Sequence, residues 1–286
     1  MTSILAAVDG SIYAQSVVDY AAWAAAKLGA SVELLQVIGR RELSSEDRSG
    51  RLVAGARRQL LEELAALDAE RAKLLIKAAR LELEDASAAL ADKGLTTAVT
   101  LRHGDLLETL AEREATSELI VIGKRGQDAE LARQTARGLH LGSNLERILR
   151  GASKPVLVAS QAYREIRRVM VAFDGRPSAM HAVAAVTQSP LFSGAEIVLA
   201  LAGRPDDEAA TKLGAAAARL QNAGFAVAKK ILPGAATDAL PQAVTDENAD
   251  LLVMGAFGHS RLRTLMIGST TAALIQSSRI PMLVYR

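Results

Sequence analysis

An internal duplication is the feature that most constrains the fold of this 286-residue chain. Residues 4–11 read ILAAVDGS and match residues 169–176, which read VMVAFDGR. Further along, residues 119–126 (LIVIGKRG) match residues 251–258 (LLVMGAFG) in the same order. Because the same segments occur twice in the same order, the chain is expected to form a tandem pair of similar domains. A solenoid would need about three or more repeats.

Each copy alternates short apolar runs with amphipathic stretches, which predicts α/β domains with parallel sheets and helices on both faces. Strands are expected at 4–8, 32–38, 97–102, 119–122 and 156–159, and again at 169–173, 196–200, 226–232, 251–254 and 282–285. Helices are expected at 12–28, 106–115, 143–150, 178–187, 210–223, 240–247 and 270–277. The polar join at 160–167 lacks flexible-linker composition, so domains 1–160 and 167–286 should pack together.

The first copy carries an additional segment, residues 40–75, that the second copy lacks. Apolar residues recur there and beyond at steps of three, four and seven, at Leu60, Leu64, Leu67, Leu74, Ala78 and Leu81. This spacing predicts an amphipathic helix outside the sheet that continues toward Leu90. Two interpretations stay open: the apolar stripe packs on its own domain, or it covers a dimer or interdomain surface.

A glycine pattern in the second copy marks a candidate ligand site. Gly255 and Gly258 follow an apolar strand, and after nine more residues Gly268, Ser269 and Thr270 open a helix. Open parallel sheets bind ligands at the carboxyl ends of their strands. A helix start offers unpaired N–H groups and a dipole that favours anions. The pattern therefore predicts a phosphate site, with a plain turn and helix cap as the alternative.

The first copy repeats this pattern with a longer spacer. Fifteen residues separate Gly126 from Gly142, and they include Arg133, Arg137 and His140. A phosphate site needs donors within hydrogen-bond reach, and a longer loop does not guarantee them. We therefore expect the second copy to be the better phosphate site.

The pattern Gly-x-x-Gly, nine residues, Gly-Ser/Thr resembles the nucleotide-binding signature of the universal stress protein family. Asp174-Gly175 after a first strand and the ending Pro281-Met282-Leu283-Val284 add to this resemblance. It implies two tandem Rossmann-like domains of the HUP, adenine nucleotide alpha hydrolase-like type, each with a five-stranded parallel sheet of order 3-2-1-4-5. It also implies an adenine nucleotide, ATP or AMP, with Mg²⁺ beside ATP, and a role in stress survival.

The resemblance assigns site residues copy by copy. In the second copy they are Phe173, Asp174, Gly175, Leu201, Gly234, Gly255, Gly258, His259, Gly268, Ser269 and Thr270. In the first copy they are Asp9, Gly10, Ser11, Val37, Gly104, Gly123, Gly126, Gly142, Ser143 and Asn144.

Within these sets, the resemblance places the two aspartates beside the adenosine, Gly104 and Gly234 near the base, and Val37 and Leu201 as an apolar wall for adenine. A turn or cap role for the aspartates and a core role for the apolar pair are the alternatives. Arg176 departs from the small polar residue that the family pattern has there.

Charge, composition and missing motifs limit the classes of function further. The net charge of +2 gives no strong pull toward nucleic acid or membrane, and no cysteine is available for disulfides or zinc. The four histidines lack metal spacing, and neither a Walker A motif nor a Gly-x-Gly-x-x-Gly fingerprint is present. No apolar run has the length of a membrane span, so a cytoplasmic protein is expected.

Three classes of function remain: a nucleotide-binding regulatory module, a slow ATPase or adenylyl transferase with His259 as the one visible base, and a nucleotide-free scaffold. We expect the first and regard enzymatic activity as open. A homodimer and an unidentified protein partner also stay open.

Overall fold

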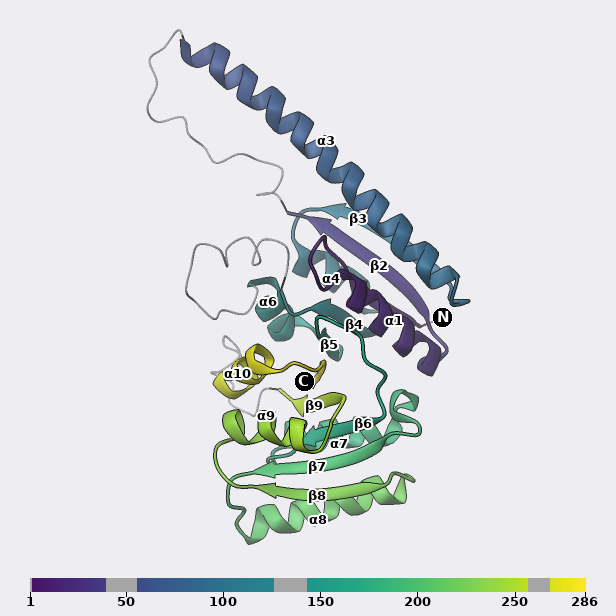
Figure 1. The fold of residues 1–286 in the computed structure, drawn as a ribbon, viewed down its shortest axis with the longest axis vertical. Helices are drawn as coiled ribbons and strands as arrows, with labels where there is room; N and C mark the ends of the chain where they lie inside the picture. The colour runs from purple at the N-terminus through teal and green to yellow at the C-terminus, as the bar shows by residue number, and fades with distance from the viewer. Residues whose placement is uncertain (1, 40–55, 126–142, 257–267) are drawn as a thin grey trace.

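The computed structural model describes residues 2–39, 56–125, 143–256 and 268–286 (Figure 1). The first half contains β1 (Ser3–Ala7), α1 (Ala14–Leu28), β2 (Ser31–Ile38), α3 (Ala56–Ala91), β3 (Thr97–His103), α4 (Leu106–Glu114), β4 (Ser117–Gly123), α6 (Ser143–Gly151) and β5 (Val156–Ala159). The second contains β6 (Arg168–Ala172), α7 (Pro177–Gln188), the short 3-10 helix η1 (Pro190–Phe192), β7 (Glu196–Ala202), α8 (Asp207–Asn222), β8 (Val227–Leu232), α9 (Ala236–Asp246), β9 (Leu251–Gly255), α10 (Ser269–Ser277) and β10 (Met282–Tyr285). The predicted alternation of strands and helices is confirmed, with boundaries that move by a few residues.

The ten strands of the described residues form one sheet, in the order β3-β2-β1-β4-β5-β10-β9-β6-β7-β8. Within each half the strands are parallel, and their order in each is 3-2-1-4-5. The α/β fold class is therefore confirmed. The expected packing of the two halves is confirmed, and it takes the form of an edge-to-edge join of their sheets.

The join is an antiparallel pairing of β5 with β10, the last strand of each half. Leu157 lies opposite Leu283, and the two leucines occupy equivalent positions of the repeat. A pseudo-twofold axis therefore passes between them. The pairing also covers two strand edges that would otherwise expose unpaired backbone groups.

Two apolar layers cover the two faces of the sheet, because successive strand residues point to opposite sides. In β1, Ile4 and Ala6 belong to one layer, whereas Leu5 and Ala7 belong to the other. The first layer is completed by side chains of α1, α3, α7 and α8. The second is completed by side chains of α4, α6, α9 and α10. Each layer runs through both halves, so the halves share their core.

The segment that joins the halves is held against α1. The hydroxyl of Tyr20 lies 3.1 Å from that of Ser160 and accepts a hydrogen bond from the backbone N–H of Arg164. The ring of Tyr163 lies 4.9 Å from that of Tyr20. Burial raises the pKa of Tyr20, so its phenol stays protonated and can donate.

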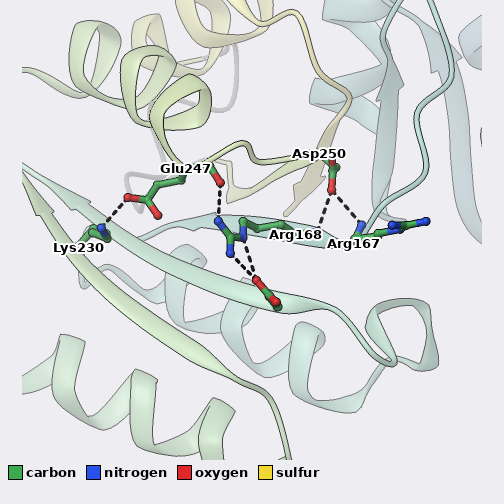
Figure 2. A network of polar contacts seen from close by, with 6 residues as sticks. Arg167, Arg168, Lys230, Glu247 and Asp250 are labelled. Atoms are coloured by element: carbon green, nitrogen blue, oxygen red, sulfur yellow. Dashed lines mark hydrogen bonds and ion pairs between the residues drawn. The ribbon is translucent and has the colours of Figure 1, made fainter.

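A polar network fixes the start of β6 (Figure 2). A carboxylate oxygen of Asp250 accepts hydrogen bonds from the backbone N–H groups of Arg167 and Arg168, at 3.0 and 2.9 Å. The guanidinium of Arg168 binds the carboxylate of Glu196 and the backbone carbonyl of Glu247. The chain therefore enters the second half at a defined position, directly beside β9.

Residues 56–75 of the additional segment are helical and belong to α3, which lies outside the sheet as predicted. Residues 40–55 of that segment lie outside the described part of the chain. Near its C-terminal end α3 packs on the first half through Ala79, Leu83 and Leu90, which are buried. No described helix has both the length and the apolar character needed to cross a bilayer.

Candidate functional site

The first turn of α10 forms the centre of the candidate site in the second half. Gly268 is the N-cap residue of this helix and provides no side-chain cap, and Gly268, Ser269 and Thr270 are all exposed. By contrast, Asp105 caps α4 and Asp206 caps α8 through their carboxylates. Among the described residues, no N-cap side chain therefore binds the N–H groups at the start of α10. Gly258 and His259 lie outside the described residues.

The glycine at position 268 is not required by the backbone. Its φ is −55°, which any residue adopts, and a Cβ there would have its nearest neighbour, Thr271 Oγ1, at 3.8 Å. A side chain at this position would therefore not force a disallowed φ. A side chain would instead occupy the space in front of the helix start, which is where a phosphate would have to lie.

The glycine at position 255 is required for a different reason. A Cβ on Gly255 would lie 2.3 Å from the carbonyl carbon and oxygen of Ser178 and 2.7 Å from the backbone nitrogen of Ala179. The end of β9 thus passes directly against the first turn of α7. Gly123 is the equivalent residue in the first half, where a Cβ would lie 2.8 Å from the Cβ of Tyr13. These two glycines serve close packing, which the sequence interpretation did not foresee.

We predict that Gly255→Ala lowers the free energy of unfolding by more than about 2 kcal/mol, because backbone atoms must move to admit the methyl group. The matched control is Gly268→Ala, which should cost less than about 1 kcal/mol, since its Cβ has room. Denaturant unfolding of both variants gives the comparison. Equal losses of stability in the two variants would contradict the close approach at Gly255.

Both aspartates that follow a first strand form local turns. Asp174 Oδ1 accepts a hydrogen bond from the backbone N–H of Arg176 at 3.0 Å, and Arg176 Nε lies 3.6 Å from Asp174 Oδ2. Asp9 Oδ1 accepts one from the backbone N–H of Ser11 at 3.2 Å. The turn role that the sequence left open is therefore present at both sites. Gly175 makes the turn feasible, since its φ of +73° is unfavourable for other residues.

Three further residues of the predicted sites, Phe173, Gly10 and Ser11, lie beside these turns. Phe173, directly before Asp174, is buried and hydrogen-bonds through its backbone N–H to the carbonyl of Ala200. In the first half, Gly10 is exposed, and Ser11 is buried, with its hydroxyl accepting from the N–H of Tyr13. Phe173 is therefore a core residue that supports the turn.

Val37 and Leu201, expected to form an apolar wall for adenine, do not occupy equivalent positions of the repeat. Strand pairing aligns Ile4 with Val32 and Val169 with Ile197, so the counterpart of Val37 is Ala202. Val37 packs on the layer that contains α6 and α10, whereas Leu201 is 5% exposed and belongs to the opposite layer. A shift of one residue along a strand reverses the face, and this explains the error.

The glycines after the third strands occupy equivalent places, with φ of +138° at Gly104 and +97° at Gly234. The next residue differs between the halves. Asp105 caps α4 and binds Arg147 of α6 at 2.6 Å, and the hydrogen bond from Arg147 lowers the pKa of Asp105. The second half has Ala235 in place of Asp105, so its candidate site lacks this fixed ion pair.

The first-half site is only partly described. Gly126, Gly142 and the basic residues of the longer spacer lie outside the described residues. Ser143 begins α6, and Asn144 in its first turn is exposed. Gly123 ends β4 at the same edge of the sheet as Asp9.

The antiparallel join places the carboxyl ends of strands in each half next to the last helix of the other half. Lys124, just after β4, donates from Nζ to the carbonyls of Gln276 and Ser278 at 2.5 and 2.9 Å, at the C-terminal end of α10. Arg286, just after β10, donates to the carbonyl of Ala152 at the end of α6. A cation at a helix C-terminus binds free carbonyls and complements the dipole. The two halves therefore cap each other.

We predict a pH-dependent contribution of Lys124 to stability. Burial, and secondly the charge of Arg125, lower the pKa of Lys124 from 10.5 to about 8. Between these values the unfolded chain binds more protons than the folded chain, so the free energy of unfolding should rise with pH from about 8 to 10.5. Below pH 8 the lysine is charged in both states and the contribution is constant.

Urea unfolding at several pH values from 7 to 10.5 measures this effect against Lys124→Met as control. The variant lacks the titrating group, so its stability should rise less over that range than that of the unchanged chain. Parallel pH profiles for the two proteins would show that the folded environment does not lower the pKa of Lys124.

No group of three or more His, Asp or Glu side chains suited to hold a metal occurs among the residues that the structure describes. His181 Nδ1 lies 2.8 Å from the carbonyl oxygen of Arg286, which gives this histidine a structural contact at the chain end.

Comparison with known proteins agrees with this geometry. The profile of the universal stress protein family matches residues 1–160 and again residues 165–286. The universal stress protein Slr1230 of Synechocystis is 35% identical, with all of both chains covered. A universal stress protein of Archaeoglobus fulgidus is similar in structure, with a TM-score of 0.68, 21% identity and 99% and 98% of the two chains covered. A second solved structure, from Pseudomonas aeruginosa, has a TM-score of 0.64 and 17% identity, with 100% and 93% covered. The chain therefore belongs to the universal stress protein family, and it carries two copies of the family's domain.

Proposed function

We propose that the second domain binds an adenine nucleotide, ATP or AMP, and that the protein is a nucleotide-responsive regulator in the stress response. The observation that carries the proposal is the uncapped, exposed start of α10 at the carboxyl edge of the sheet. Phosphate oxygens would accept from the N–H groups around Gly268, Ser269 and Thr270, with adenosine toward Asp174. Gly258 and His259 belong to the same motif.

The topology of the sheet supports this location of the proposed nucleotide site. From β6 the chain continues to β7 and β8 through helices on one face, and it returns through α9 to β9 and β10 on the other face. The strand order thus reverses between β6 and β9. Ligands of open α/β sheets bind at such a switch point, outside the carboxyl ends of the strands. Asp174 follows β6 and Gly255 ends β9, so these residues flank the switch point.

The interaction energies are of the right order before association costs are counted. Hydrogen bonds to charged groups contribute roughly 1.5–3 kcal/mol each. Three or four donors are therefore comparable with the roughly 8 kcal/mol of a micromolar complex, before association costs are subtracted. Since no described residues form a metal-binding group, Mg²⁺ would be held chiefly by the phosphates of ATP.

The second domain is favoured over the first by two differences. Its motif keeps the nine-residue spacing, against fifteen in the first domain. In the first domain the carboxylate of Asp105 caps α4 and pairs with Arg147 of α6, whereas the second domain has alanines at both positions, Ala235 and Ala273. A carboxylate close to an anion site lowers the affinity for phosphate, even when a cation partly compensates it.

Gly268→Val tests the proposal, with Gly142→Val as the matched variant of the first domain. Calorimetric titration with ATP and AMP should follow removal of co-purified nucleotide and a check of folding. Gly268→Val should weaken binding at least about tenfold, or about 1.4 kcal/mol, because its side chain fills the phosphate position. Gly142→Val should have a smaller effect.

If Gly142→Val removes binding and Gly268→Val does not, the working site lies in the first domain. If neither the unchanged chain nor the variants bind adenine nucleotide, the scaffold function is correct and the proposal fails. A turnover assay on the same proteins separates binding from hydrolysis.

A further inference from the structure

Among the described residues, helix α3 packs on the rest of the protein through its C-terminal half. It spans Ala56–Ala91, runs beside the edge strand β3 and extends well past the end of the sheet (Figure 1). Its anchoring contacts lie in its C-terminal half, where Ala79, Leu83 and Leu90 are buried and Glu82 binds the side chain of Gln36 at 3.0 Å. The described side chains from Leu60 to Arg71 are exposed or, at Asp68, half-buried.

A stripe of exposed leucines follows this helix. We call Leu60, Leu64, Leu67, Leu74 and Leu81 the leucine stripe. Four of these residues repeat every seven positions. Leu64, Arg71 and Ala78 follow four residues after the first three of them, so the two sets together have the spacing of a coiled-coil seam. Leu67 and Leu74, at the middle, are 64% and 62% exposed. Large exposed apolar surfaces of this kind mark sites of association.

The charges beside the stripe identify its occupant. Between Leu60 and Leu81 the acidic residues all precede position 71 and the basic residues all follow position 70. The acidic set is Glu62, Glu63, Asp68 and Glu70, and the basic set is Arg71, Lys73, Lys77 and Arg80. An identical helix in antiparallel orientation places the acidic half of each copy beside the basic half of the other. A parallel arrangement would place like charges together, which disfavours it.

We propose that the leucine stripe is a homodimerisation surface on which α3 of a second copy packs antiparallel to α3 of the first. The twofold axis passes close to Glu70 and Arg71, and Leu67 of each copy lies near Leu74 of the other. The seam spans about 32 Å at 1.5 Å per residue. Five leucines from each copy leave water, and the segregated charges set the orientation. This surface is separate from the candidate nucleotide site in the second domain.

The oligomeric state of the full chain tests the surface. Analytical ultracentrifugation should find a dimer for the unchanged chain and a monomer for the double variant Leu67→Gln, Leu74→Gln, with a dissociation constant raised at least a hundredfold. Glutamine suits an exposed helix and changes no charge, so circular dichroism should show unchanged folding. The matched control is Val99→Gln with Ile231→Gln, which changes two exposed apolar residues on the edge strands and should remain dimeric.

Three outcomes would overturn the proposal. The unchanged chain could be monomeric at all concentrations, the stripe variant could remain dimeric, or the stripe could bind anionic lipid vesicles while the chain stays monomeric. The last result would assign the stripe to a membrane surface.

Disulfide trapping tests the orientation, because the chain has no cysteine of its own. Arg71→Cys lies on the seam near the proposed axis, so its two copies should cross-link on mild oxidation. Ala78→Cys also lies on the seam, but in the antiparallel dimer its copies are about 22 Å apart along the helix, too far for a disulfide. Cross-linking of both variants would indicate a parallel pair and contradict the proposed orientation.

Discussion

The antiparallel pairing of β5 with β10 is the interaction on which the rest of the structure depends. Three residue pairs, centred on Leu157 and Leu283, convert two five-stranded sheets into one sheet of ten strands. The pairing makes both apolar layers continuous, so each half stabilises the other. It also reverses the strand direction, which places the carboxyl ends of the two sets of strands on opposite edges of the sheet. The two candidate sites are therefore separated, although they derive from one duplicated motif.

The same reversal explains the mutual capping of the halves. The carboxyl edge of each half meets the C-terminal end of the other half's last helix, and a cation completes each contact, Lys124 at α10 and Arg286 at α6. Helix α10 thus has its open N-terminus at the proposed nucleotide site and its C-terminus held by the first domain. The proposed phosphate contacts require the backbone N–H groups of α10 to stay in place, so this contact from the first domain would support the proposed site of the second.

The sequence was sufficient to predict the fold of each half, because the apolar strands are local signals and the duplication repeats them in the same order. Strand and helix order followed from them, and the resemblance supplied the 3-2-1-4-5 order that both halves show. The edge-to-edge join could not be foreseen, because two edge strands of suitable composition can pair or stay apart without a change in sequence pattern. The site was harder to predict. A glycine needed for packing, such as Gly255, looks the same in a motif as a glycine where a side chain would have room, such as Gly268. Leu201 was misplaced because an error of one residue along a strand reverses its face.

Native mass spectrometry of the intact chain, after removal of bound small molecules and incubation with ATP or AMP, tests the central claim most directly. If the second domain is the working site and the first is not, the chains should carry at most one adenine nucleotide each, with about half of them occupied at a concentration equal to the dissociation constant. Two equivalent nucleotides per chain would contradict the distinction between the halves. A chain that remains free of nucleotide at every concentration would contradict the assignment of α10 as a phosphate-binding helix.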